Sequence, residues 1–467
     1  MSTSSRRTFD VVVIGAGPSG LISSLYARRA GFSVALIEKL PEPGGMSRSI
    51  SIANQSVDLG SHRLHYAMGD RVRAELEGLL SLKLQIRRRK GRIRVGDTWV
   101  NYPLSLMNLF SDLPFSVFKN LLLDQITRLF KSKTDHVNFT DRIIGSFGPT
   151  LFNLFYRPYA LKLWGTPPDE LSVLVADQRV SALSIRSRIQ RLIPFFNSRW
   201  KRFLYPVGGY GEIAKALAAE AESSGVEFFY NASVTEINAT SPNSCVISTE
   251  TGSFETKNVW STLPVTQIAS LMMPPAPTEI IQLSNELTHR AMVLLYVVVD
   301  QAQYTEFDAH YIPDSDSIIS RISEPKNYSD VSGSSATTVL CVEIPCWRGD
   351  SVWQSSDEAL RDQVIEEMQS MGLPQVIGSD VHSYRLGHVY PVMKQGFEKH
   401  LVSLSEWLQS YNWLLVFGRQ GLFVPDNLHH ALDMGICAVD ALSSDGVIDR
   451  EQWQESLKQF KEHVVED

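Results

Sequence analysis

The sequence predicts an α/β fold in which strands and helices alternate, and three stretches far apart in the chain support this prediction. The first is the apolar run 10–14, which ends in glycines and leads into a helical pattern at 21–29. The second is an alternation of helical and strand patterns over 206–264. The third is the apolar run 413–417, which ends in glycines before another helical pattern. Strand, turn and helix in this repeated order are typical of a mostly parallel sheet, so we expect a Rossmann-like domain that is discontinuous in sequence.

The first glycine turn has the sequence Gly15-Ala-Gly17-Pro-Ser-Gly20, with the spacing G-x-G-x-x-G. Gly15 permits the tight turn, Gly17 lets the backbone approach a pyrophosphate, and Gly20 lets the helix pack close to the strand. The phosphates would lie at the N-terminus of the helix, where unpaired N–H groups favour negative charge. A second apolar run, 34–37, ends in Glu38, close to the spacing of about 20 residues for an acid that binds a ribose. The alternative is an ordinary glycine-rich turn, but this order of features predicts a dinucleotide site.

Composition and length set the broad class of the protein. A chain of 467 residues exceeds one ordinary hydrophobic core, so we expect two domains. The hydrophobic content of 43% is typical of a globular protein, and the formal net charge of −7 disfavours nucleic acid as a partner. No apolar run approaches the ~20 residues that span a bilayer, and no secretory segment precedes the first strand. Cys245, Cys341, Cys346 and Cys437 have the spacing of neither a zinc site nor a redox pair, so we expect a cytoplasmic protein without a metal site.

The segments between the α/β pieces have different patterns. The pair Gly44-Gly45 allows the backbone to lie against a ligand, with a plain surface turn as the alternative. The basic stretch 83–94, with the residues up to 103, predicts a hairpin with a charged solvent face; steering of an anionic substrate or contact with acidic lipid is the alternative. Residues 104–160 are predicted to be helical, and the amphipathic pattern at 117–130 fits a domain-cap helix better than a helix at a membrane interface.

These patterns predict a nucleotide-binding domain in three pieces and a second domain inserted twice. The nucleotide-binding domain is expected to comprise residues 8–75, 203–288 and 386–445, the inserted domain residues 76–202 and 289–385, and a C-terminal helix residues 446–467. Within the insertion, residues 192–203 predict an irregular basic and aromatic connector.

The chain resembles FAD-dependent flavoproteins of the amine oxidase and protoporphyrinogen oxidase superfamily, and within it the relatives of UDP-galactopyranose mutase. The opening fingerprint with Glu38, the Gly44-Gly45 pair and the late turn Gly418-Arg419-Gln-Gly421 match the three places where that superfamily holds FAD. The resemblance implies a discontinuous GR2-type FAD-binding domain, an inserted α+β substrate domain, and FAD bound without a covalent link. The residues implied in cofactor binding are Gly15, Gly17, Pro18, Ser19, Gly20, Glu38, Lys39, Gly44, Gly45, Met46, Ser47, His62, His65, Val234, Gly418, Arg419, Asn427 and Leu428.

Five shorter motifs resemble those of the mutase in particular. They are Gly60-Ser-His62-Arg-Leu-His65, Tyr159-Ala-Leu-Lys162-Leu-Trp164-Gly165, Gly208-Gly209-Tyr210, His289-Arg290 and Val389-Tyr390-Pro391-Val392. By this resemblance the catalytic residues would be His65, Trp164, Arg290 and Tyr390, and the substrate would be bound by Tyr159, Arg179, Tyr210, Arg290 and Tyr390. Arginine and tyrosine suit a diphosphate because they present rigid hydrogen-bond donors. Each side chain also has a structural alternative, as a buried histidine, a core tryptophan or a tyrosine packed at a helix start.

One departure from the mutase pattern bears on the substrate. In the stretch Val424-Pro425-Asp426-Asn427-Leu428, Pro425 stands where the mutase has a phosphate-binding tyrosine. The main hypothesis is therefore a flavoenzyme that acts on a sugar or sugar nucleotide through flavin N5 chemistry, with the nucleotide left open. The alternative is an FAD-dependent oxidoreductase in which His65 and Lys162 handle protons. The third hypothesis is a flavoprotein that binds FAD only as a scaffold or sensor. In each case the expected partner is a small molecule. Contact with a membrane is not favoured, and the oligomeric state is left open.

Overall fold

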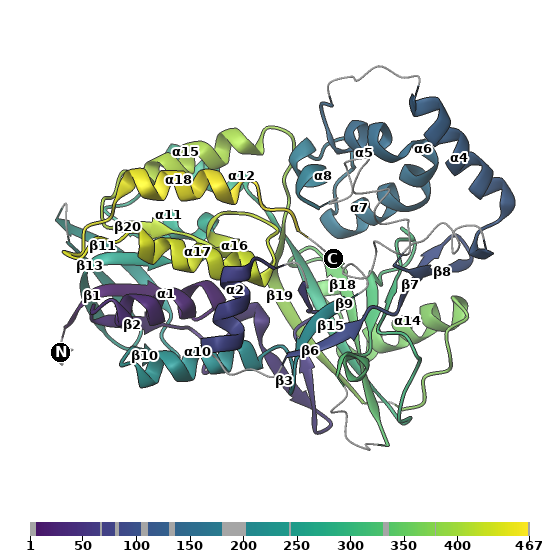
Figure 1. Cartoon of the computed structure of the whole chain (residues 1–467), viewed down its shortest axis with the longest axis horizontal. Coiled ribbons are helices and arrows are strands. Elements are labelled where there is room, and N and C mark those ends of the chain that lie inside the picture. Colours follow the sequence, from purple (N-terminus) through teal and green to yellow (C-terminus); the bar gives the residue numbers. More distant parts are fainter. Residues whose placement is uncertain are drawn as a thin grey trace.

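The computed structural model describes residues 6–65, 68–79, 84–103, 111–129, 136–179, 202–241, 244–329, 336–378 and 380–465. Figure 1 shows three parts: an α/β part, a second sheet beside it, and a separate group of helices. Segments from the start, the middle and the end of the chain lie together in the α/β part (Figure 1). The predicted α/β fold, with a discontinuous nucleotide-binding sheet and an inserted α+β part, is confirmed.

The sheet of the α/β part has the strand order β10-β2-β1-β13-β12-β11-β14, with β20 paired to β13. Its central pairs β2–β1, β1–β13 and β13–β20 are parallel, whereas β13–β12 and β12–β11 are antiparallel. All four residues of β2 are buried, as expected for a parallel strand covered on both faces. The strands are β1 (Arg7–Ile14), β2 (Val34–Ile37), β10 (Glu227–Phe229), β11 (Val234–Ser241), β12 (Ser244–Thr249), β13 (Ser253–Ser261), β14 (Met272–Met273) and β20 (Leu414–Val416).

Helices from all three pieces of the chain cover this sheet, and two of them touch through glycines. A Cβ added to Gly20 of α1 would lie 2.0 Å from the carbonyl oxygen of Gly15. A Cβ added to Gly435 of α17 would lie 2.4 Å from Ile22 of α1. The two helices therefore pack at backbone distance. The helices of this part are α1 (Pro18–Arg29), α10 (Glu212–Ser223), α11 (Val265–Leu271), α12 (Thr278–Glu286), α15 (Phe397–Gln409), α16 (Gly418–Gly421), α17 (Leu428–Asp440) and α18 (Arg450–Phe460).

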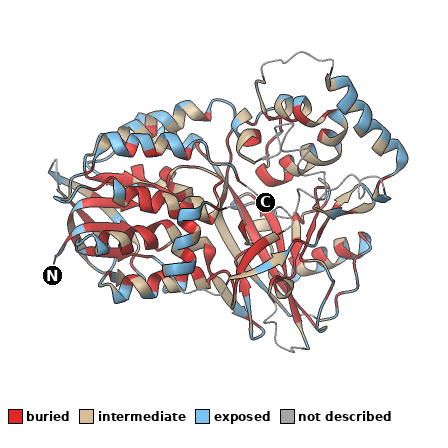
Figure 2. Cartoon of the chain, in the orientation of Figure 1, coloured by how far each residue is buried: buried red, intermediate tan, exposed pale blue. Residues whose placement is uncertain are grey.

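The second sheet has the strand order β19-β15-β18-β17-β16-β7-β8, and β15 and β18 are its buried centre. Figure 2 shows the corresponding red band of buried residues beside α14. Its strands are β7 (Gly91–Val95), β8 (Thr98–Tyr102), β15 (His289–Val299), β16 (Ala309–Tyr311), β17 (Arg321–Ser323), β18 (Thr338–Cys346) and β19 (Val381–Pro391). The helix α14 (Asp357–Ser370), the single turn of helix α13 (Ser351–Gln354) and the turn η5 (Pro325–Tyr328) belong to the same stretch of chain.

Two small sheets connect the larger ones. One pairs β3 (Ser49–Ile52) with β4 (Gln55–Asp58), and the other has the order β5-β9-β6, with β5 (Leu64–His65), β6 (Leu84–Arg88) and β9 (Arg202–Pro206). The predicted hairpin in the basic stretch is therefore placed differently: β7 pairs with β8, while β6 pairs with β9. The reason is long-range, because the N–H of Lys90 donates to Asp308 and β7 then pairs with β16.

The third part is a group of helices, and one of them is largely exposed. Its elements are α4 (Phe115–Leu129), α5 (Phe139–Phe147), α6 (Pro149–Leu151), η3 (Phe152–Tyr156), α7 (Arg157–Trp164) and α8 (Val173–Arg179). The helical prediction for 104–160 is confirmed at 115–129 and, apart from a break at Gly148, at 139–160, whereas residues 136–138 are not helical. Residues 104–110 and 130–135, and positions 192–201 of the predicted connector, lie outside the described residues. Figure 2 shows α4 mostly pale blue, and its Phe115 is 72% exposed. The turns η1 (Gly45–Ser47) and η2 (Glu75–Leu79) and the helix α2 (Asp70–Ala74) complete the described elements.

Two sequence-level points can be compared with the structure. All four cysteines are buried and free. Among the described residues, no helix combines the length and apolar character needed to cross a bilayer. The cytoplasmic location stays a prediction.

The glycine packing of α1 gives a stability test. In Gly20→Ala the new methyl group meets the backbone oxygen of Gly15 at 2.0 Å, so either α1 or the preceding turn must move. We expect a loss of stability on the order of 3 kcal/mol, measured by urea unfolding. Gly17→Ala is the matched control, because its Cβ meets no atom within 4 Å and its φ of −73° suits alanine. Equal stability of the two variants would contradict the packing described here.

Candidate functional site

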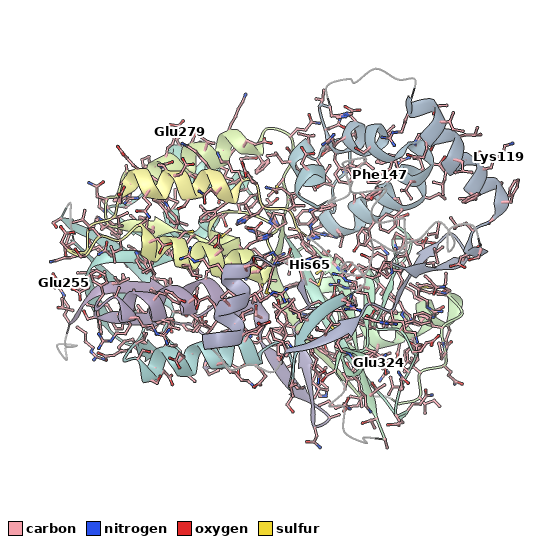
Figure 3. The ribbon with its side chains drawn as sticks, viewed as in Figure 1. His65, Lys119, Phe147, Glu255, Glu279 and Glu324 are labelled. Carbon is pink, nitrogen blue, oxygen red and sulfur yellow. The ribbon has the colours of Figure 1, made fainter. Side chains whose placement is uncertain are left out.

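A cavity of about 800 Å³ lies where the three parts of the structure meet. Figure 3 labels His65 near this junction. Most of the residues predicted for a site line the cavity: Gly15, Gly17, Pro18, Ser19, Glu38, Lys39, Gly45, Met46, Ser47, His62, Tyr159, Arg179, Tyr210, Val234, Tyr390, Gly418, Arg419, Asn427 and Leu428. The predicted residues that do not line it are Gly20, Gly44, His65, Trp164 and Arg290. The roles of both groups stay predictions, but the structure brings only the first group together.

At one end of the cavity, the three glycine turns named in the sequence lie against one another. Gly45 is close to Gly17, since a Cβ on Gly45 would lie 3.4 Å from the Gly17 Cα. Gly418 has a φ of +82°, and a Cβ there would lie 3.0 Å from the Ser19 hydroxyl oxygen. Gly44 donates its N–H to the Ala16 carbonyl at 2.7 Å, which joins the second turn to the first. Three distant segments therefore form one cradle without side chains.

The cradle has the features of an anion and ribose site. No side chain caps the N-terminus of α1 at Gly17, so its N–H groups are available to a phosphate. Glu38 is buried, and its carboxylate accepts hydrogen bonds from the N–H groups of Ala16 at 2.8 Å and Leu40 at 3.0 Å. These bonds fix the acid beside the turn, where it also lines the cavity.

In the middle of the cavity, His62 stacks on Tyr210. Their ring centroids are 5.0 Å apart with an angle of 18° between the planes. Burial, together with the nearby charges of Arg321 and Arg419, lowers the pKa of His62 to about 3, so the ring is neutral. Its Nδ1 is buried and has no hydrogen-bond partner among the described residues. A ligand in the cavity can therefore supply the missing partner.

The carboxylate of Asp58 places Tyr210. Asp58 accepts hydrogen bonds from the Ser49 hydroxyl at 2.6 Å, the Tyr205 hydroxyl at 2.6 Å and the Tyr210 N–H at 3.0 Å. Its backbone carbonyl accepts from the Tyr296 hydroxyl of β15 at 2.7 Å. The side chain is 1% exposed, and burial raises its pKa to about 6 although the three hydrogen bonds act in the opposite direction.

At the other end, Tyr390 is flanked by two arginines. The Arg179 guanidinium lies 4.8 Å from the centre of its ring and the Arg419 guanidinium 5.8 Å from it. Arg419 donates to the Val389 carbonyl at 2.9 Å, which holds its side chain beside β19. Tyr159 lines the same cavity from α7. This arrangement presents two cations and two phenol rings to a bound molecule.

The floor of the cavity contains polar residues that sequence reasoning did not single out. Glu343 of β18 pairs in register with Arg321 of β17, and Arg321 with Tyr311 of β16. Arg63 and Arg89 line the cavity beside this row. Arg63 follows the predicted His62 and Arg89 belongs to the basic stretch, so local signals existed for these two. No motif in the local sequence predicts that Arg321 and Glu343 lie opposite each other in the sheet.

Four side chains with a predicted role in the chemistry, Trp164, Arg290, Lys162 and His65, do not line the cavity. Trp164 is buried and packs against Phe139, with ring centroids 5.9 Å apart. The Arg290 guanidinium lies 4.6 Å from the centre of the Trp347 ring and donates to the Pro345 carbonyl at 3.4 Å.

Lys162 donates to the carbonyls of Ile312 at 2.7 Å and Ile319 at 2.6 Å, and burial lowers its pKa to about 8. This amino group joins α7 to the second sheet. His65 is buried on β5 and does not reach the cavity surface.

The C-terminal segment passes over the cavity towards the helical group. His463 Nδ1 lies 2.7 Å from a carboxylate oxygen of Asp426, and its ring stacks on His430 with centroids 4.1 Å apart. Val465 lines the cavity and donates its N–H to the Gln178 carbonyl of α8 at 2.7 Å. Asp426, His430 and His463 offer ligand atoms within 4.8 Å of one another. Because the two imidazoles are stacked, their in-plane lone pairs run side by side rather than converging on one ion.

Comparison with known proteins agrees with this geometry. The sequence profile described as flavin-containing amine oxidoreductase matches residues 18–396, which include the second sheet, the helical group and the Gly44-Gly45 turn of the cradle. The chain belongs to this family. It is therefore a flavoenzyme, and the family name implies a flavin cofactor.

Solved structures of this fold include enzymes of different chemistry. Reduced UDP-galactopyranose mutase has a TM-score of 0.80 and 20% identity over 98% of this chain and 100% of that chain. Cyclohexylamine oxidase from Brevibacterium oxydans IH-35A has a TM-score of 0.67 and 15% identity over 93% of this chain and 98% of that chain. These similarities establish the fold of this chain.

Curated relatives match only a short stretch. A ferredoxin–NADP reductase of Salinispora arenicola is 62% identical over 39 residues, which are 8% of this chain and 12% of that protein. Hydroxyneurosporene desaturase of Rubrivivax gelatinosus is 43% identical over 54 residues, 12% of this chain and 10% of that protein. The chain thus shares about a tenth of the length of these relatives.

The buried Asp58 gives a pH-dependence test. Its folded pKa of about 6 lies above the usual 3.8, so its contribution to stability is fully present below pH 3.8 and is lost as the pH rises through 6. Between pH 5 and pH 8 the loss is on the order of 1 kcal/mol. The side chain of Asp58→Asn does not titrate, so the variant does not lose this stability as the pH rises. Urea unfolding should therefore show that the free energy of unfolding of Asp58→Asn, relative to that of the wild type, increases by about 1 kcal/mol from pH 5 to pH 8. A constant difference at both pH values would contradict the assignment.

Proposed function

We propose that this protein binds FAD non-covalently along the cavity and acts on a sugar or sugar nucleotide. The observation that carries the proposal is the group around Tyr390, where Arg179, Arg419 and Tyr159 face the cavity that begins at the dinucleotide cradle. Arginine forks and phenol hydroxyls are suited to a diphosphate. The same positive charge disfavours a protonated amine in this position.

The residues present fit FAD as the cofactor. The uncapped N-terminus of α1 and the open space at Gly17 suit a pyrophosphate, and Glu38 suits a ribose. His62 lines the middle of the cavity, and its Nδ1 has no hydrogen-bond partner among the described residues. This atom can therefore form a hydrogen bond with the cofactor, either as donor or as acceptor. When bound, FAD supplies a nucleophilic N5 and reversible electron transfer.

The chain's own residues would bind and orient the substrate. Arg179 and Tyr159 come from the helical group, and Tyr390 comes from the second sheet, so a substrate between them would bridge the two parts. The neutral His62 adds no positive charge in the middle of the cavity. Arg179 and Arg419 would offset the charge of a diphosphate leaving group and keep it in place.

A second candidate is a net oxidoreductase that uses the same cavity. Two observations favour it: the family is one of oxidoreductases, and Arg290 lies on Trp347 instead of facing the cavity. Pro425 also lines the cavity where the mutase pattern has a tyrosine. In this candidate the substrate would lose hydride to the flavin and oxygen or another acceptor would reoxidise it.

Anaerobic titration separates the two candidates. The purified protein is expected to carry FAD that acid precipitation releases into the supernatant. Reduced with dithionite and titrated with UDP-, GDP- and dTDP-sugars, it should show a change in the flavin spectrum and isomerised sugar with at least one of them. No response to any of them would overturn the sugar-nucleotide proposal. Turnover under air with release of peroxide would establish the oxidoreductase.

A pair of variants tests the substrate residues. Arg179→Gln is expected to retain FAD and to weaken the binding of the responding sugar nucleotide by about tenfold or more, because a charge-assisted hydrogen bond is lost. Arg290→Gln is the matched comparison, and it should change that affinity less than threefold, since Arg290 contacts Trp347 outside the cavity. The reverse result would return Arg290 to the role implied by the family resemblance.

A further inference from the structure

The floor of the cavity is a polar row whose charges are already paired. Arg321 Nη2 donates to both carboxylate oxygens of Glu343, at 2.7 and 2.8 Å, and Nε donates to one of them at 2.9 Å. The Glu343 carboxylate also accepts from the Ser61 N–H at 2.8 Å. This bidentate pair is electrically neutral as a unit, so it offers little net charge to a ligand.

Arg63 is paired in the same way. Its guanidinium lies 3.2 Å from one carboxylate oxygen of Asp308, and the other oxygen accepts from the Lys90 N–H at 3.0 Å. Burial lowers the pKa of Arg63, but Asp308, Tyr328 and Tyr311 together raise it by more, so the pKa lies above its usual value. The charge of this second arginine is therefore also balanced within the protein.

Arg89 differs from both. It precedes Lys90, lines the cavity and is only 8% exposed. Its Nε is buried without a hydrogen-bond partner, and among the described residues the guanidinium has neither a hydrogen bond nor an ion pair. A buried cation without a partner is unfavourable, because it loses hydration and gains no compensating contact. A group that enters the cavity can supply that contact.

The position of Arg89 separates it from the group around Tyr390. Tyr390 lies on β19 at one edge of the second sheet, and Arg89 lies in the connection between β6 and β7, of which β7 is five strands further along the order. At about 4.8 Å between neighbouring strands, this is on the order of 24 Å along the sheet. Arg89 therefore belongs to a part of the chain that is remote from the group around Tyr390 in the order of strands.

We propose that Arg89 binds a second anionic group of the substrate, a carboxylate or a phosphate, in a part of the cavity away from the group around Tyr390. The proposal rests on the proposed function, in which the first anionic group lies at Arg179. It narrows the substrate class to a molecule with two separated acidic groups, such as the nucleotide derivative of a sugar acid or sugar phosphate. Arginine suits this role because its planar fork binds either group through two hydrogen bonds.

Ligands without a nucleotide test the proposal independently of the sugar-nucleotide reaction. Galacturonate and galactose 6-phosphate are each compared with galactose, by titration of the flavin-loaded protein followed in its visible spectrum and melting temperature. In the wild-type protein one of the two charged sugars should bind about tenfold or more tightly than galactose. Which one is preferred identifies the group as carboxylate or phosphate.

Three variants assign this preference to Arg89. Arg89→Gln should reduce the preference to less than about threefold with the flavin content unchanged, and Arg89→Lys should retain part of it. Arg88→Gln is the matched control, because Arg88 is the exposed neighbour that does not line the cavity, and it should retain the full preference.

Three outcomes would overturn the proposal: no preference for either charged sugar in the wild-type protein, a preference that survives Arg89→Gln, or loss of flavin from Arg89→Gln, which would place Arg89 at the cofactor. If nucleotide sugars give no response but the charged sugars show the Arg89-dependent preference, the proposed function fails and the anionic subsite stands.

Discussion

The buried carboxylate of Asp58 is the constraint on which the geometry of the site depends. It receives a hydroxyl from its own hairpin, a hydroxyl from β9 and the N–H of Tyr210 in the glycine turn before α10. The backbone of the same residue binds the second sheet through Tyr296. One short side chain therefore joins three separate stretches of chain to the sheet that forms the cavity floor. Because an unsatisfied buried carboxylate is costly, all of these stretches must meet at one place for the carboxylate to be satisfied.

The hydrogen bonds of Asp58 fix the position of His62, which lies beside the glycine cradle. Tyr210 is fixed by its backbone bond to Asp58, and His62 stacks on its ring. The cradle itself needs no side chain, since Gly17, Gly45 and Gly418 leave room for a ligand between three turns. The hydrogen-bond network of Asp58 and the glycine cradle thus lie next to each other. The first fixes the geometry and the second provides the space.

The charges around the cavity explain how a family with varied substrates can keep one fold. Arg63 and Arg321 are each paired with a carboxylate of the protein, Asp308 and Glu343, so they stabilise the fold. Arg89 and Arg179 face the cavity from a strand connection and from a separate helical group. Loops and inserted helices can change without altering the central sheets, and substrate preference can therefore change while the cradle is kept.

The sequence by itself determined the α/β fold, the three glycine turns and the residues of the cradle. These features are local: a turn, a strand period and a helix N-terminus are each specified within about ten residues. The resemblance to the mutase added Tyr159, Arg179 and Tyr390, which the structure brings to the cavity, and Trp164 and Arg290, which it does not. Only the tertiary structure decided which arginines are paired. Arg321 meets Glu343 across two strands whose register depends on long-range pairing, and Arg63 meets Asp308 from a residue far away in the sequence. No local pattern records which partner each charge will have. Among the described residues the buried Arg89 has no ion pair, and that is a property of the folded chain alone.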